Sequence, residues 1–430
     1  NNDTLLVTSP GIYTAKATTT TCSSEETIDI YQPLYVAKTG SDATGDGSFS
    51  NPFLTIQKGI DEASEGQKIY VLPGTYEEGE LDFETSSNSG IYKSVYIASD
   101  LVRLNDSSAI ASTVIDADGE DKIFNIQGSN TSIIEGFTLT GMITANWESS
   151  VIYLRNGAAP TFKNLVIKGN TEVNDAYGPI INIRSASPVF EDILIEGHGS
   201  QNNTWRSMAY ISDNSSDVSF TNVIWKDNYA WDYGIIGVWS GAKATLTNNL
   251  FIDNFHDHWR GILNIHNSSS MTLINSTVVN NTATSEAQLV SFWDASNKTE
   301  LTLINSVLGN VTNPSFQIYN NGGNNAYVTA RNSILPLWTS GSNQASKITW
   351  DVDATNVFAD PQLDTDGTLK DNSPAIGLGS SQPFVFGGVT YTPPTTDLAG
   401  VTRPDPAGSS PDAGAYESDK AQGDFDILLS

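Results

Sequence analysis

The sequence is poor in cysteine and in charge, and it has no long apolar run. One cysteine among 430 residues excludes a disulfide-stapled scaffold and a cysteine-rich zinc site. No apolar run approaches the roughly 18 residues that a membrane-spanning helix needs. Charged residues make up 16% of the chain, against roughly 25% in an average soluble domain. Asn, Ser, Thr and Gly must therefore supply most of the polar surface.

Basic residues are also scarce. The chain has 21 Lys and Arg against 49 Asp and Glu, which gives a formal net charge of −28. Nucleic acid phosphates and anionic membrane surfaces repel such a protein. We therefore expect no nucleic acid partner and no membrane insertion.

A repeat of 26 to 30 residues runs from about residue 123 to residue 340. Each unit has an Asn-containing strand, a second polar residue, a variable loop and another apolar strand. The first polar column is Asn164, Asp192, Asn222, Asn249, Asn275, Asn305 and Asn332. The second is Asn170, His198, Asn228, Asn254, Asn281 and Asn310. Because His198 occupies an Asn position, we interpret it as a member of a side-chain ladder and not as a catalytic group.

The repeat predicts a solenoid. Strands of three to five β-prone residues between Gly, Asn and Ser turns cannot bury a face alone. Stacking one unit on the next pairs each strand with its copy and closes a continuous core. A leucine-rich repeat lacks support, because its leucine signature is absent. We therefore predict an all-β chain with a right-handed parallel β-helix over residues 33–345.

The two ends of this region resemble known proteins. Residues 35–42 (YVAKTGSD), 51–57 (NPFLTIQ) and 71–76 (VLPGTY) resemble the opening of secreted right-handed β-helix proteins. That superfamily includes polysaccharide lyases, glycoside hydrolases, epimerases and large bacterial surface adhesins. Residues 358–361, 373–376, 403–404 and 412–417 resemble their closing segment. The resemblance implies an extracellular or cell-surface location and is weak for activity.

The flanking parts have their own expected structures. Pro52 fits the first position of a capping helix over about residues 53–64, and residues 68–71 read as the first strand. Residues 1–32 resemble part of an immunoglobulin-like repeat, whose Cys22 would have its partner in a missing half. The alternative is a strand hairpin packed on the solenoid with Cys22 buried. We expect residues 346–418 to close the β-helix, residues 419–430 to be a linker, and the chain to belong to a longer polypeptide.

One face of the predicted solenoid carries candidate functional residues. Alternation along the strand after each loop sends two columns outward. The first is Tyr153, Asn182, Tyr210, Gly237, Asn264, Ser291 and Gln317. The second is Arg155, Arg184, Ser212, Trp239, His266, Trp293 and Tyr319. Five loop aromatics precede these strands at similar offsets: Trp147, Tyr177, Trp205, Trp231 and Trp259.

This pattern favours carbohydrate binding. Aromatic faces stack on sugar rings, and planar donors hold hydroxyls or carboxylates. The alternative is that the tryptophans only close the loops over the solenoid wall. The residues expected to bind a polysaccharide or cell-surface glycan are Trp147, Tyr153, Arg155, Tyr177, Arg184, Trp205, Tyr210, Trp231, Trp239, Trp259, His266 and Trp293.

Three functions fit this face. The first is a glycan-binding adhesin or stalk module without catalysis, joined to further domains of the same polypeptide. The second is a polysaccharide-active enzyme, a lyase or a glycoside hydrolase, in the Arg/Tyr/Trp groove. The third is a spacer without a ligand. No cofactor is expected, although two acidic turns are candidates for structural Ca²⁺. Their residues are Asp116 and Asp118 in one turn, and Asp364 and Asp366 in the other.

Overall fold

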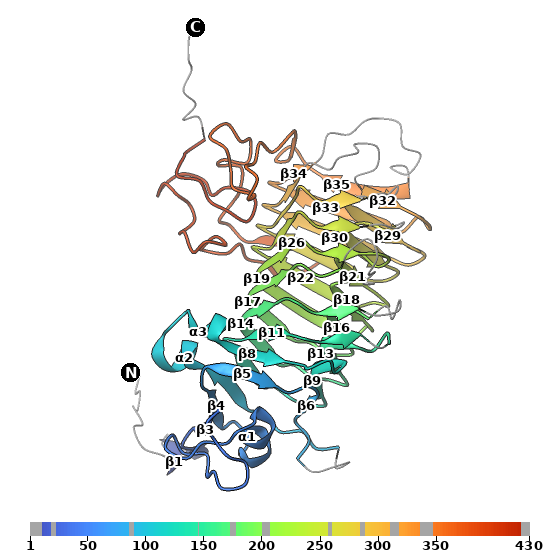
Figure 1. Cartoon of the computed structure of the whole chain (residues 1–430). Helices are drawn as coiled ribbons and strands as arrows, with labels where there is room; N and C mark the ends of the chain where they lie inside the picture. Colours follow the sequence, from blue (N-terminus) through green and yellow to red (C-terminus); the bar gives the residue numbers. More distant parts are fainter. Residues whose placement is uncertain are drawn as a thin grey trace.

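The computed structural model describes residues 11–18, 23–85, 90–144, 146–172, 178–199, 207–256, 260–283, 289–309, 318–335 and 347–422. Within these residues the chain winds into a β-solenoid whose successive turns pair their strands in parallel (Figure 1). The fold is a right-handed parallel β-helix, as the repeat predicts.

One wall of the solenoid is a nine-stranded parallel sheet. Its strands are β6 (Leu81–Asp82), β9 (Lys122–Gln127), β13 (Ser150–Arg155), β16 (Ile181–Arg184), β18 (Ala209–Ser212), β21 (Ile236–Val238), β25 (Leu263–His266), β29 (Val290–Trp293) and β32 (Ile318–Asn320). These are the strands that follow the variable loops, so this wall carries the two outward columns.

The other walls form a twenty-stranded sheet whose strands are arranged in two rows. The two rows belong to one sheet because β14, β17 and β19 are long enough to pair in both. The first row holds β3 (Leu34–Val36), β4 (Lys68–Val71), β7 (Tyr96–Ser99), β10 (Ile133–Glu135), β14 (Thr161–Ile167), β17 (Val189–Glu196), β19 (Asp217–Lys226), β22 (Lys243–Thr247), β26 (Ser270–Ile274), β30 (Thr299–Ile304), β33 (Ala326–Arg331) and β35 (Ile348–Val352). The second row adds β5 (Gly74–Glu77), β8 (Thr113–Asp116), β11 (Thr138–Thr140), β23 (Leu250–Ile252), β27 (Thr277–Val279), β31 (Val307–Leu308), β34 (Ile334–Leu335) and β36 (Val357–Phe358).

Small sheets and helices complete the described part. The small sheets comprise β12 (Ile143–Thr144) with β15 (Thr171–Glu172), β20 (Tyr229–Ala230) with β24 (Phe255–His256) and β28 (Thr282–Ala283), and the hairpin β37 (Phe384–Phe386) with β38 (Val389–Tyr391). A second antiparallel hairpin, β1 (Gly11–Thr18) with β2 (Ser23–Ile30), forms a sheet of its own. The likeness of this hairpin to an immunoglobulin-like repeat stays a prediction, and Cys22 lies outside the described residues. The described helices are α1 (Ile56–Glu62), α2 (Asp100–Leu104) and α3 (Ala109–Ser112), and none is long and apolar enough to span a bilayer.

The first helix begins later than its sequence predicts. Thr55 is the N-cap of α1, and its side chain accepts a hydrogen bond from the Lys58 amide. Pro52 therefore lies before the helix, and its prediction as the first helical residue is wrong. Phe53 pairs with Val36 of β3 in a parallel bridge, which keeps the chain extended up to the cap. The buried Ile56 and Ile60 hold α1 against β3 and β4.

The first polar column is a ladder of left-handed residues at the bend between the two rows. Asn164, Asp192 and Asn222 have φ values between 51° and 56°, and Asn222 donates to the Asp192 carboxylate. In the next rung the ladder residue is Asn248, and not Asn249 as the sequence spacing predicted. Asn249 points inward instead, where its amide oxygen accepts from the Trp225 indole.

The second polar column is a buried ladder along the solenoid, and the interpretation of His198 as one of its members is confirmed. His198 Nδ1 lies 3.1 Å from the Asn228 amide oxygen, and its Nε2 lies 3.2 Å from the Asn170 amide nitrogen. The ladder continues from Asn228 to Asn254 and from Asn254 to Asn281. A neutral ring that donates from Nδ1 and accepts at Nε2 satisfies both neighbours. Burial lowers the pKa of His198 from 6.5 to about 4.

This ladder makes stability depend on pH. The pKa of His198 is lower in the folded protein than in the unfolded chain. The contribution of His198 to the free energy of unfolding is therefore complete above about pH 6.5 and is lost as pH falls toward 4. A shift of this size corresponds to about 3 kcal/mol at full loss. We expect His198→Asn to remove this part of the pH dependence, measured by urea unfolding at pH 7 and pH 4.5. Equal pH dependence of both proteins would contradict the ladder role.

The closing segment, residues 359–422, folds back along the second row of the large sheet (Figure 1). Ladder amides of successive rungs donate to its main-chain carbonyls. These bonds join Asn248 to Thr396, Asn275 to Asp412, Asn305 to Ser380 and Asn332 to Leu378. The segment is therefore tied to the solenoid rung by rung, although it has little regular structure.

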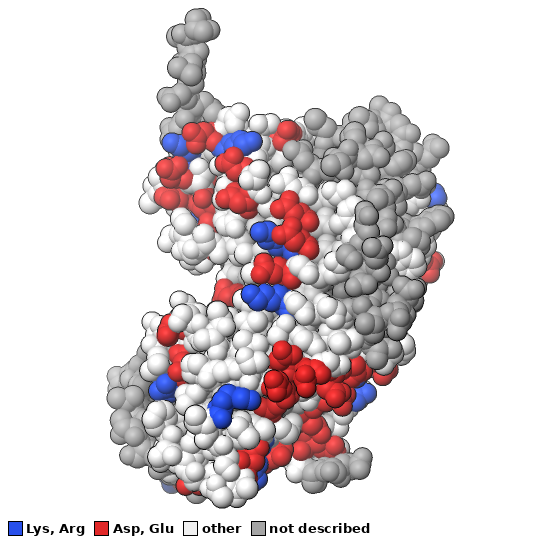
Figure 2. All heavy atoms as spheres, in the orientation of Figure 1, with Lys and Arg blue, Asp and Glu red and all other residues white. Residues whose placement is uncertain are grey.

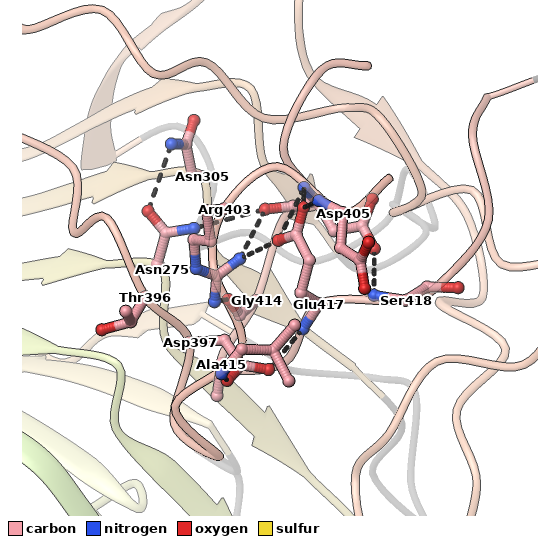
Figure 3. A network of polar contacts seen from close by, with 12 residues as sticks. Asn275, Asn305, Thr396, Asp397, Arg403, Asp405, Gly414, Ala415, Glu417 and Ser418 are labelled. Carbon is pink, nitrogen blue, oxygen red and sulfur yellow. Dashed lines mark hydrogen bonds and ion pairs between the residues drawn. The ribbon is translucent and has the colours of Figure 1, made fainter. Parts of the chain in front are cut away.

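A buried guanidinium organises this segment (Figure 3). Arg403 forms an ion pair with Glu417 at 2.6 Å, and the two side chains are 2% and 0% exposed. Arg403 also donates to the Gly414 carbonyl, and the Glu417 carboxylate accepts from the Asp405 amide. Burial raises the pKa of Glu417 despite the nearby guanidinium.

Candidate functional site

The outward columns of the nine-stranded sheet have the expected register over six rungs. Tyr153 pairs with Asn182, and Asn182 with Tyr210. In the second column Arg155 pairs with Arg184, and His266 with Trp293. Rungs of such a sheet lie about 4.8 Å apart, so neighbouring side chains in a column touch.

The last rung departs from the predicted register. Ile318 pairs with Val290 and Tyr319 with Ser291, so Tyr319 lies in the first column and not in the second. Asn320 takes the next inward position and is fully buried. Phe316 and Gln317, which the sequence placed in this rung, lie outside the described residues.

The first outward column is mostly covered, although Tyr210 is partly exposed. Tyr153 is 3% exposed, and Asn182, Asn264 and Ser291 are fully buried. The Asn182 amide donates to the Trp147 carbonyl, so the loop before β13 lies over this column. Tyr153 is therefore too buried to contact a ligand directly. Its ring lies 5.2 Å from the Arg155 guanidinium and supports that side chain from below.

At the surface, arginines stack on aromatic rings. The Arg184 guanidinium lies 3.9 Å from the centre of the Trp147 ring and 5.9 Å from that of Tyr210. Its Nε donates to the Asn182 amide oxygen, which fixes the plane of the guanidinium. Trp147 is 46% exposed, so one ring face is accessible beside a fixed cation.

Three rings surround Arg260, three rungs beyond Arg184. Its guanidinium lies 4.6 Å from the Tyr233 ring, 5.0 Å from Trp239 and 4.6 Å from Trp293. Asp232 binds it at 2.6 Å. Trp239 also stacks on His266 with ring centres 4.0 Å apart. Cation–π contacts at partly desolvated sites stabilise by about 1–2 kcal/mol each, so Arg260 holds three rings of the two neighbouring rungs in place.

The exposed part of this wall is called here the aromatic–arginine face. It consists of Trp147, Arg184, Tyr210, Tyr233, Trp239, Arg260, His266 and Trp293, all partly buried or exposed. Tyr210 contacts Tyr233 at 5.7 Å and Trp239 at 6.0 Å, which joins the two clusters into one strip.

Gly237 makes room for this arrangement. A Cβ at this position would lie 2.9 Å from the Trp239 indole nitrogen and 2.8 Å from the Tyr233 carbonyl oxygen. Both contacts are shorter than van der Waals distance. The Trp239 ring therefore occupies the space that a side chain at position 237 would take.

Two titratable groups of the face, His266 and Tyr210, are uncharged near neutral pH. Burial lowers the pKa of His266 to about 4, with the Arg260 charge adding to the shift and Asp294 opposing it. Burial also raises the pKa of Tyr210, although Arg184 opposes the change. Within the described residues the ring nitrogens of His266 have no hydrogen-bond partner, so they can bind a ligand hydroxyl.

The loop aromatics are only partly placed. Trp147 belongs to the face, and Trp231 is partly buried in the loop before β21. Tyr177, Trp205 and Trp259 lie outside the described residues. Tyr233 and Arg260 were not among the predicted binding residues. Both lie three residues before the first inward residue of their rungs, Ile236 and Leu263, and that shared offset was a signal in the sequence.

The carboxylates of the two acidic turns hydrogen-bond within their own turns. The Asp116 carboxylate accepts from the Asp118 amide, and Asp366 accepts from the amide and hydroxyl of Thr368. These oxygens stabilise their own turns. Among the described residues no group of three or more His, Cys, Asp or Glu side chains is arranged to hold a metal ion.

The comparisons with known proteins include one solved structure. No protein-family model matches the sequence, and no curated protein matches it. A solved structure described as the complex of XylC with xylose is 12% identical, and the match covers 90% of this chain and 98% of that chain with a TM-score of 0.37.

Proposed function

We propose that the aromatic–arginine face binds a carbohydrate chain that carries carboxylate or sulfate groups. The observation behind this proposal is the strip of rings and guanidinium groups that runs over successive rungs of one wall. Rings with an accessible face stack on the apolar faces of sugars, and guanidinium groups bind anionic oxygens in two-point contacts.

The distribution of arginine favours an acidic glycan. The sequence has seven arginines, and Arg155, Arg184 and Arg260 lie along this wall. Arg155 and Arg184 have no acidic partner among the described residues. On a chain with a net charge of −28, guanidinium groups that have no acidic partner in the described part of the chain mark a place where an anion can approach.

The setting of the site is part of the proposal. We propose that this β-helix is a glycan-binding adhesin or stalk module of a larger extracellular polypeptide, displayed at a cell surface. The resemblance of residues 35–76 and 358–417 to the ends of secreted β-helix proteins supports this location.

A second candidate is an eliminating lyase. The observation in its favour is a neutral His266 near Arg260, since a base and a carboxylate-neutralising cation are the groups such a reaction needs. A pKa of about 4 makes His266 a weak base at neutral pH. Tyr210, whose pKa is raised, is protonated there and is no base either. Binding without cleavage is therefore the function we favour.

The experiment that tests the proposal screens the purified chain against soluble acidic and neutral polysaccharides. Binding is followed by tryptophan fluorescence, and elimination by the ultraviolet absorbance of the unsaturated product. We expect binding to acidic chains without rising absorbance. Rising absorbance that His266→Ala abolishes would establish the lyase instead. Silence in both channels would favour a spacer without a ligand.

Binding is expected to depend on salt and on the planar shape of Arg184. Arg184→Gln removes the charge over Trp147, so we expect affinity to fall about threefold to tenfold and its salt dependence to flatten. Arg184→Lys keeps the charge but loses the planar stack, and should restore the salt dependence without restoring affinity. Titrations at low and high sodium chloride measure both quantities. An unchanged salt dependence for Arg184→Gln would contradict a charged contact.

A further inference from the structure

The flank formed by the second row of the large sheet is covered at both ends and open between them. Val166, Leu194, Ile224 and Leu250 are register partners in β14, β17, β19 and β23 and point outward. Figure 2 shows this flank hollowed between the α2–α3 region and the closing segment. This hollow flank lies away from the nine-stranded sheet that carries the glycan face.

The chain itself covers the two ends of the column. At one end the Thr138 hydroxyl donates to the Ile110 carbonyl of α3, and Thr138 is buried. At the other end Leu250 and Ile252 are each 3% exposed beneath the closing segment. Between them Val166 and Leu194 stay partly exposed, and so does Ile224, which borders the cluster that contains Leu250 and Ile252. Three consecutive rungs thus keep an aliphatic strip in contact with solvent.

The amide ladder beside this strip has unused donors in the same rungs. In the covered rungs Asn248 and Asn305 donate once to a neighbouring ladder residue and once to a carbonyl of the closing segment. In the open rungs Asn164 donates only to Glu135, and Asn222 only to Asp192, among the described residues. A side-chain amide carries two N–H groups, so each has one left for an incoming acceptor.

We propose that this hollow flank binds an extended polypeptide segment of a partner protein in the way that the closing segment binds the neighbouring rungs. The segment's carbonyls accept from Asn164 and Asn222, and its aliphatic side chains cover Val166, Leu194 and Ile224. Aliphatic floor residues suit a peptide better than a sugar, because the floor offers no aromatic ring for stacking. The inference is independent of the proposed glycan function.

A charged residue beside the hollow flank indicates which amino acids the bound peptide should contain. Asp192 is exposed in the middle of the ladder and has no ion-pair partner among the described residues. Arg403 of the closing segment lies at the matching place in the covered rungs, where its Nη2 is 3.5 Å from the Asn248 amide oxygen. A basic residue of the incoming segment would meet Asp192 in the same manner. The expected ligand is therefore an aliphatic peptide with one basic residue.

The test selects short random peptides displayed on phage against the full chain and measures their affinities by fluorescence anisotropy. The variant Leu194→Asp places a charge on the floor of the hollow flank. Val189→Asp is the matched control, because Val189 also points outward from β17 but lies before the bend at Asp192. Thermal unfolding confirms that both variants fold.

The proposal expects aliphatic, singly basic peptides that bind the wild type and Val189→Asp equally and Leu194→Asp about tenfold more weakly. Amide hydrogen exchange should place them over β14, β17 and β19. Failure to select any such peptide, or equal binding to Leu194→Asp, would overturn the proposal. Concentration-dependent self-association that Leu194→Asp abolishes would also overturn it, since the flank would then bind a second copy.

Discussion

Replacing Trp239 by alanine is expected to weaken glycan binding at least about 30-fold, which corresponds to about 2 kcal/mol. The indole stacks on His266 at 4.0 Å and contacts Tyr233 at 4.5 Å and the Arg260 guanidinium at 5.0 Å. Its removal frees Arg260 on one side and opens a gap in the strip of rings. Calorimetric titration with the acidic polysaccharide that binds the wild type most tightly measures the loss of affinity.

Two controls separate this effect from unfolding. Trp239→Phe keeps a ring over Gly237 and should recover much of the affinity, while the melting temperatures of both variants stay close to that of the wild type. Gly237→Ala should behave like Trp239→Ala, because its methyl group displaces the indole. Wild-type affinity in Trp239→Ala would mean that the glycan lies elsewhere.

Replacing Arg403 by methionine is expected to destabilise the fold by about 3–5 kcal/mol. The change leaves Glu417 without its cation in a site where both side chains are almost fully buried. It also removes the bond to the Gly414 carbonyl, which joins two stretches of the closing segment. Urea unfolding gives the loss, and limited proteolysis reports release of residues 395–418.

The double variant Arg403→Met/Glu417→Leu distinguishes the buried charge from the lost packing. Since most of the cost is the uncompensated carboxylate, the second change should recover a large part of the stability. No recovery would mean that the guanidinium acts mainly through its bonds to main-chain carbonyls. Glycan binding should persist in both variants where they are folded, because the aromatic–arginine face is on another wall.

The fold could be predicted because every rung of a β-helix has the same pattern of apolar strand positions and polar bend positions. Apolar alternation in strands such as β16 and β25 sets the inward and outward columns, and polar residues mark the bends. The predicted register was wrong at two places. At one bend the sequence offers two adjacent Asn residues, and Asn248 occupies the bend instead of Asn249. In the last rung Tyr319 pairs with Ser291, two positions from its predicted register. Short helices α2 and α3 had no periodic signal and were not predicted.

The site was harder to predict than the fold. Residues of the second column follow from strand alternation, so Arg184, Trp239 and His266 could be placed on one wall. Exposure could not be inferred in the same way, since Tyr153 and Asn182 of the first column are buried whereas Tyr210 of the same column is partly exposed. Arg260 belongs to a loop and reaches rings of neighbouring rungs, and such contacts depend on loop paths that no repeat constrains.

The measurement that tests the central claim most directly is hydroxyl-radical footprinting of the chain with and without a bound acidic polysaccharide. We expect protection of Trp147, Tyr210, Trp239 and Trp293, while Tyr70 and Trp350 on the other walls stay unchanged. Protection confined to the other walls, or no protection at a saturating concentration of a glycan that binds, would contradict it.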